Sequence, residues 1–174
     1  MSHREIQKRD EVKAQEVLKA SLKMSQRVYS SYVSDLTDEE LMLRPGPGCN
    51  HIAWQLGHLI SSNTSILNAV LPDAAPSLPE GFDQKHGKSN SASDDPKDFL
   101  TKQQYVELFS KLDDAIFAAI DRLSEADLDQ PSPEPWRGRF PTIGSLAVVL
   151  VAHTMMHVGQ WVPIRRKLQK PVLI

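Results

Sequence analysis

The sequence predicts an all-α protein with four long helices in a single domain. Three observations support this prediction. Apolar residues recur every three to four positions in four segments, which is the spacing of one helix face. Residues that favour helix N-termini precede these segments, and segments rich in proline and glycine separate them. A chain of 174 residues fits one domain of ordinary size, which we place at residues 1–174.

The first predicted helix covers residues 5–33. Lysine, arginine and glutamate fill one face of this helix, and the other face carries Ala14, Leu18, Leu22, Ser25, Tyr29 and Tyr32. Thr37-Asp-Glu-Glu40 then has the pattern of a capping box, which predicts a short helical turn over residues 38–43. Pro45-Gly-Pro-Gly48 ends this turn.

The second predicted helix begins with Asn50 as its N-cap and runs to about Leu71. Its apolar face consists of Ile52, Leu56, Leu59, Ile60, Asn63, Leu67 and Val70. His58 lies at the flank of this face, where a side chain can face a neighbouring helix and still reach solvent. We expect His51, at the start of the helix, to be exposed.

Residues 71–98 show no helical periodicity, and loops of this length inside a compact domain are commonly lids or crossovers. A crossover of this length would allow the second and third helices to run parallel. His86 lies in this segment and could join a metal site only if the loop folded over that site.

The third and fourth helices follow two further capping signals. Thr101-Lys-Gln-Gln104 is a capping box, and the helix after it has an apolar face of Tyr105, Leu108, Phe109, Leu112, Ile116, Ala119, Ile120 and Leu123. A proline-rich loop follows over residues 124–141, and Thr142 can cap the fourth helix. We expect Pro163 to kink this helix or to end it early, because its ring would clash with the carbonyl of Gly159.

The fourth helix carries two histidines, His153 and His157, on its apolar face. Residues four positions apart lie one turn apart on a helix, so both imidazoles can bind one ion. A metal site needs three or four ligands, and His58 is the best candidate for the third. Three neutral imidazoles would leave one position open for water or substrate. In the alternative without a metal, Gln160 and Asn63 would satisfy these histidines.

Two motifs resemble those of the DinB-like (YfiT-like) family. The segment from Arg44 to Leu59 is similar to the second-helix signature of that family, and His153-x-x-x-His157-x-Gly159-Gln160 is similar to its fourth-helix signature. The resemblance covers residues 36–171. It implies a four-helix bundle with a divalent metal held by His58, His153 and His157. Ser62 and Asn63 stand where many relatives carry a glutamate, so a general acid or base at that point is missing.

The resemblance also implies a range of functions. The family includes thiol S-transferases that use bacillithiol, mycothiol or glutathione, and isomerases that depend on mycothiol. We therefore interpret the chain as a metal-dependent enzyme of the S-transferase type that acts on a small molecule, with a low-molecular-weight thiol as cosubstrate. A metal-dependent hydrolase and a non-catalytic metal-binding stress-response scaffold remain alternatives. Imidazole ligands suit zinc, nickel and iron alike, so the sequence does not select the ion.

Three residues are candidates for contacts with the substrate. Arg137 and Arg139 lie in the second loop, and a guanidinium can hold a carboxylate in two places. Gln160 follows the second histidine of the fourth helix by one turn. Cys49 is the single cysteine, and nothing in the sequence pairs it with a base, so we do not expect it to act as a nucleophile.

Composition predicts the partners and the compartment. The net charge of −2, with mixed signs along the chain, gives no basis for nucleic-acid binding. The N-terminus lacks the apolar segment of a secretory signal, and the longest apolar run, Leu146 to Ala152, is too short to span a membrane. We expect a cytoplasmic protein without a membrane partner. We also expect a homodimer, because Leu78, Phe82 and Trp136 have no obvious place in one bundle.

Overall fold

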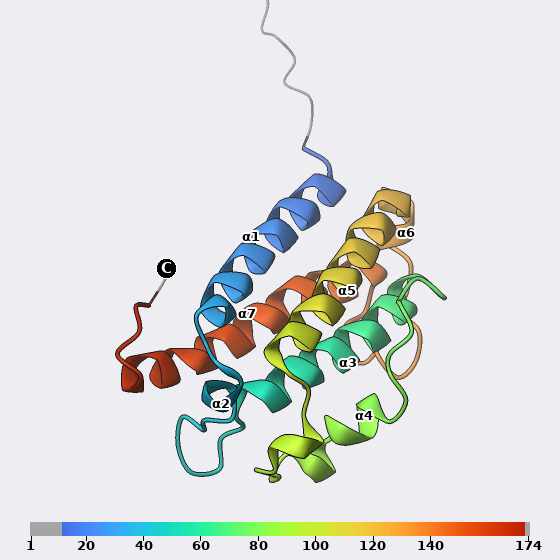
Figure 1. The fold of residues 1–174 in the computed structure, drawn as a ribbon. Helices are drawn as coiled ribbons and strands as arrows, with labels where there is room; N and C mark the ends of the chain where they lie inside the picture. The colour runs from blue at the N-terminus through green and yellow to red at the C-terminus, as the bar shows by residue number, and fades with distance from the viewer. Residues whose placement is uncertain (1–11, 173–174) are drawn as a thin grey trace, which may run out of the picture.

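The computed structural model describes residues 12–172 and shows an all-α fold, as predicted (Figure 1). Over these residues the long helices are α1 (Ala14–Ser34), α3 (Ile52–Val70), α5 (Lys102–Arg122) and α7 (Ile143–Lys167). The short helices are α2 (Asp38–Leu41), α4 (Phe82–Lys85), η1 (Lys88–Asn90), η2 (Pro96–Asp98) and α6 (Glu125–Leu128). Helix α1 begins at Ala14, so residues 12 and 13 of the first predicted helix are not helical, and the part before residue 12 lies outside the described residues.

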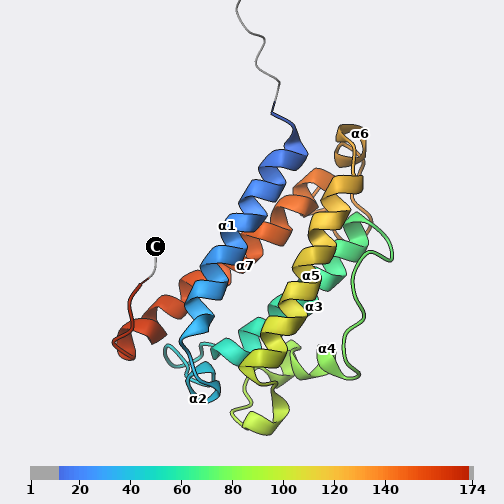
Figure 2. The same ribbon diagram turned by 45° about the horizontal axis from the view of Figure 1, so that its top comes forward.

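The four long helices pack into a bundle in which α1 and α3 each contact both α5 and α7. In Figures 1 and 2, α1 and α7 run in one direction along the bundle, and α3 and α5 run in the other. The crossover at residues 71–101 returns the chain from the end of α3 to the start of α5. Because of this return, α3 and α5 run parallel, an arrangement that the length of the crossover allowed. The apolar faces of all four helices meet in one core, which includes Leu22, Tyr32, Ile60, Leu67, Phe109, Ile116, Leu146 and Trp161.

Caps were predicted for four helices, and three of these helices begin at the predicted residue. The side chains of Thr37, Thr101 and Thr142 accept hydrogen bonds from the amides three residues later. The N-cap of α3 is His51 instead of Asn50, since His51 Nδ1 accepts a hydrogen bond from the Trp54 amide at 3.0 Å. His51 is also fully buried, so its predicted exposure is wrong. The crossover covers it, and its Nε2 lies 3.1 Å from the carbonyl oxygen of Ser93.

Helix α7 continues through Pro163 to Lys167, so of the two predicted effects of Pro163, a kink or an early end, the early end does not occur. Packing against α1 stabilises its last turns. Arg165 is fully buried and contacts Asp35 through two hydrogen bonds of 2.7 and 2.9 Å. In the described part of the chain, α7 is the one helix whose length and composition would suit a membrane span. The core helix of a soluble bundle has the same character, and α7 buries the polar side chains of Thr154 and His157.

The crossover is anchored on the bundle by two buried side chains, Phe82 and His86. The ring of His86 lies 2.9 Å from the Phe82 carbonyl through Nδ1 and 2.7 Å from the Tyr105 hydroxyl through Nε2. This ring occupies the space that a side chain at Gly57 would need. The crossover therefore packs directly on the backbone of α3, one residue before His58.

The apolar residues that suggested a homodimer have places within one chain. Phe82 is buried, and Leu78 and Trp136 pack partly buried against the core. These residues therefore no longer support the argument for a dimer, which stays a prediction.

Candidate metal centre

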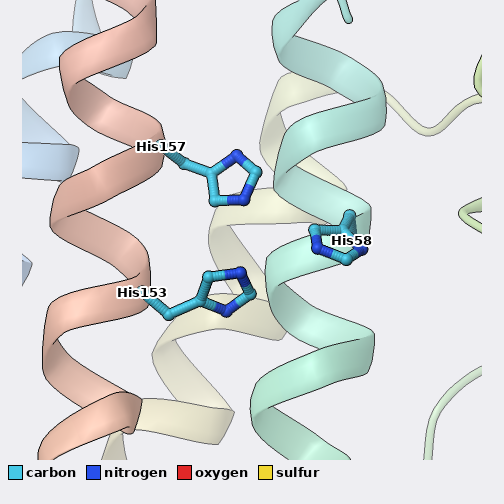
Figure 3. A group of neighbouring side chains, drawn as sticks. All are labelled: His58, His153 and His157. Carbon is cyan, nitrogen blue, oxygen red and sulfur yellow. The ribbon is translucent and has the colours of Figure 1, made fainter.

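Three histidines from two neighbouring helices lie close together in the bundle (Figure 3). His58 projects from α3, and His153 and His157 project from successive turns of α7. The ring centroid of His58 lies 5.3 Å from the centroid of His153 and 5.3 Å from that of His157. The centroids of His153 and His157 are 4.9 Å apart. Each ring offers one nitrogen such that all three nitrogens lie within 4.8 Å of one another. The structure thus brings together the three histidines that were proposed as metal ligands from the sequence.

His157 is oriented by a hydrogen bond to Gln55, a fully buried residue of α3. The Gln55 side-chain oxygen lies 2.9 Å from both His157 Nδ1 and Trp161 Nε1, while its amide nitrogen donates to the Asn50 carbonyl at 2.7 Å. Because that oxygen can only accept, we assign the proton to His157 Nδ1. The lone pair of His157 Nε2 is then free to bind an ion, which is the usual arrangement for a histidine ligand.

His58 makes no hydrogen bond to another of the described residues, and it is oriented by stacking. The ring of Trp54 lies parallel to it, with centroids 4.9 Å apart and an interplanar angle of 6°. Trp54 is itself fixed, because it is buried and its Nε1 donates to the carbonyl of Gly87 at 3.2 Å. The crossover therefore helps to hold the plane of a candidate ligand.

Burial keeps the three imidazoles neutral at physiological pH. Desolvation, with a smaller contribution from neighbouring histidines, lowers the pKa of His157 to about 3 and that of His153 to about 4. Desolvation, and then the charge of Lys88, also lowers the pKa of His58. The neutral imidazole is the form that binds metal ions.

The arrangement fits a divalent ion by two further criteria. His153 Nδ1 is buried and has no hydrogen-bond partner among the described residues, although buried polar atoms are rarely left unpaired. Bonds of about 2.0–2.1 Å to a tetrahedral ion place ligand nitrogens about 3.4 Å apart. The three nitrogens now lie within 4.8 Å of one another, and rotations of the imidazole rings would bring them to the separation of about 3.4 Å that a bound ion requires. Within residues 12–172, no cysteine or carboxylate joins this cluster as a fourth ligand.

The cluster opens into a cavity of about 410 Å³. His58 and His153 form part of its wall, and the other lining residues are Ser62, Ile66, Trp136, Arg139, Phe140, Val149, Ala152 and Met156. A volume of this size suits a small organic molecule. The open side of the three-histidine cluster therefore faces a space that can hold a ligand.

The residues predicted to contact a substrate have different positions. Arg139 lines the cavity. Arg137 does not, and its Nε donates to the Ser132 carbonyl at 2.8 Å. Gln160 is exposed on α7 and is absent from the cavity wall. Asn63 contacts Thr154 and the Leu150 carbonyl at 3.4 Å, so Gln160 and Asn63 are not the partners of the histidines.

Gln55 and Trp54, which orient the histidines, were not identified from the sequence. Both precede His58 by about one helical turn, so their spacing places them beside it. Their partners across the site, His157 and Gly87, lie far away in sequence. Spacing alone therefore gave no reason to select them.

Comparisons with known proteins identify the family and the fold. Residues 21–161 match the model of the DinB superfamily. No curated protein matches the sequence significantly. The structure is similar to the crystal structure of a conserved protein from Enterococcus faecalis, with a TM-score of 0.64 and 17% sequence identity over 90% of this chain and 97% of that chain. At this identity the similarity shows a common fold.

Proposed function

Because this chain belongs to the DinB superfamily and holds a cluster of three imidazoles, two of which line a cavity, we propose that it is a metal-dependent thiol S-transferase. The observation that carries the proposal is the cluster of His58, His153 and His157, in which His58 and His153 line a space that can admit a ligand. In the proposed reaction, the thiol loses its proton to solvent and its sulfur forms a bond to an electrophilic carbon. The leaving group departs with the electron pair of the bond that breaks.

The side chains around the site support this proposal by what they hold in place. A divalent ion bound to the three histidines would supply a Lewis acid that lowers the pKa of a thiol in the cavity. Gln55 keeps His157 Nδ1 protonated, so that Nε2 points its lone pair toward the site. Trp54 fixes the plane of His58. Burial excludes the imidazolium form that would repel a cation.

The chemistry of the cavity favours thiol transfer over the alternatives. No aspartate or glutamate lines the cavity in the described part of the chain, so hydrolysis would lack a carboxylate base. A thiol with a lowered pKa is a good nucleophile without such a base. A purely structural metal site would be enclosed by a fourth protein ligand, whereas this cluster borders a cavity.

Metal analysis and calorimetry on protein purified without a histidine tag test this proposal. We expect about one divalent ion per chain, with zinc, nickel and iron as the candidates. Bacillithiol, mycothiol, glutathione and cysteine would each be titrated into metal-loaded and metal-stripped protein. We expect at least one thiol to bind only the metal-loaded form, and more tightly as the pH rises toward the pKa of that thiol.

Three outcomes would count against the proposal. Absence of bound metal after incubation with each ion would remove the metal site. Equal thiol binding by both forms would remove the role of the metal in thiol binding. Metal binding without affinity for any thiol would favour a metal-dependent hydrolase or a scaffold.

A further inference from the structure

The cavity beside the three histidines has an uneven distribution of charge. Arg139 is the one lysine, arginine, aspartate or glutamate among its described lining residues. Most of the remaining wall is apolar and consists of Ile66, Trp136, Phe140, Val149, Ala152 and Met156. A ligand that matches this wall has an apolar body and a single negative charge.

Arg139 is available to bind such a charge. It lies in a turn of the loop between α6 and α7, where its amide donates to the Trp136 carbonyl at 3.0 Å. Its guanidinium lies over the ring of Phe140, 5.4 Å from the ring centroid. Within residues 12–172, no carboxylate lies within ion-pair distance of it, in contrast to Arg137, which is 3.6 Å from Glu134.

The two arginines of this loop therefore differ in what they can do. Arg137 is held away from the cavity by its bond to Ser132 and its ion pair with Glu134. Arg139 lies over the ring of Phe140, and both residues line the cavity. An anion that entered the cavity would find an unpaired guanidinium next to apolar surface, where an ion pair is screened less than in open solvent.

We infer that this cavity binds a small aromatic or aliphatic carboxylate, with its anionic end at Arg139 and its apolar body against Trp136 and Phe140. The opposite end of such a molecule would face His58 and His153. This inference deepens the proposed function, because it identifies the class of molecule that the site would accept. The binding of the anion itself requires no metal.

The anion contact is tested first in metal-free protein at pH 8, where imidazoles are neutral. NMR titrations would measure the dissociation constants of 3-phenylpropanoate and of its neutral isostere 3-phenylpropanamide. We expect the carboxylate to bind about fivefold more tightly than the amide, the effect of one partly exposed ion pair. We also expect the difference to shrink in high salt.

Two matched variants assign this preference to one residue. Arg139→Gln should bind the carboxylate and the amide equally, while Arg137→Gln should keep the preference of the unaltered protein. Both arginines are exposed, so both variants should fold. An unchanged preference in Arg139→Gln, an equal loss in both variants, or failure of both probes to bind would overturn the inference.

A second pair of probes connects this inference with the proposed metal site. The compound 4-(sulfanylmethyl)benzoate carries a carboxylate at one end and a thiol at the other, and 4-methylbenzoate lacks the thiol. We expect equal affinities in metal-free protein and tighter binding of the thiol in zinc-loaded protein, with both compounds weakened by Arg139→Gln. If zinc does not strengthen the binding of the thiol compound while Arg139→Gln still weakens both compounds, the proposed function is refuted. If zinc strengthens thiol binding but Arg139→Gln weakens neither compound, the inference is refuted.

Discussion

Replacing Gly57 by alanine should destabilise the protein, although the same change in an open helix position is stabilising. Gly57 lies in the middle of α3, and the ring of His86 from the crossover packs against its backbone. A Cβ at this position would lie 1.9 Å from Cδ2 of His86 and 2.3 Å from its Cγ and Nε2. The ring must therefore move, and the crossover must move with it.

The magnitude follows from three contributions. Overpacking of a buried position costs about 1–3 kcal/mol. Displacement of His86 also leaves the buried hydroxyl of Tyr105 without the nitrogen to which it donates, which costs about 1–3 kcal/mol. Alanine in place of glycine in a helix returns about 1 kcal/mol. The net loss in the free energy of unfolding is therefore about 3 kcal/mol, within a range of about 1–5 kcal/mol.

Urea unfolding followed by circular dichroism would measure this change. Gly159→Ala is a matched control, because Gly159 is also helical and a Cβ there meets no atom within 4 Å in the described part of the chain. The control should gain about 1 kcal/mol. In a protein that already carries His86→Ala, the clash is absent, so adding Gly57→Ala should not lower the free energy of unfolding. A Gly57→Ala variant as stable as the unaltered protein would refute the packing argument.

Three further predictions concern the metal site, a buried carboxyl group and the quaternary structure. His157→Ala should lower zinc occupancy and remove most of the increase in melting temperature that zinc gives the unaltered protein, because an ion that binds the native state stabilises it; full occupancy with an unchanged melting temperature would contradict this role. Burial raises the pKa of Asp113 to about 6, so its contribution to stability is complete below pH 4 and is lost as the pH rises through 6. Asp113→Asn keeps an acceptor for the Tyr29 hydroxyl and should raise the free energy of unfolding at pH 8 by about 3 kcal/mol, with little change at pH 4; an equal effect at both pH values would rule out ionisation as the cause. Sedimentation at tens of micromolar should show a homodimer, and a species with the 19.5 kDa mass of one chain would refute this.

Local sequence patterns predicted the helices well because helix formation depends on neighbours three and four residues away. The capping threonines act on amides within the same turn, so Thr37, Thr101 and Thr142 were identifiable without any knowledge of the fold. The errors occurred where a distant segment intervenes. His51 is buried by the crossover, and α7 continues past Pro163 because its last turns pack against α1.

The same distinction applies to the candidate site. The sequence by itself determined that His153 and His157 share one face of a helix, because their spacing is that of one helical turn. The sequence also made His58 the best candidate for the third ligand, and the resemblance to a family implied the same three histidines. Only the tertiary structure decided that α3 packs beside α7, that Gln55 and Trp54 orient the rings, and that Arg139 lines the cavity while Arg137 does not. These relationships join residues that are distant in sequence, and they arise from the packing of helices and the path of loops, which no local pattern records.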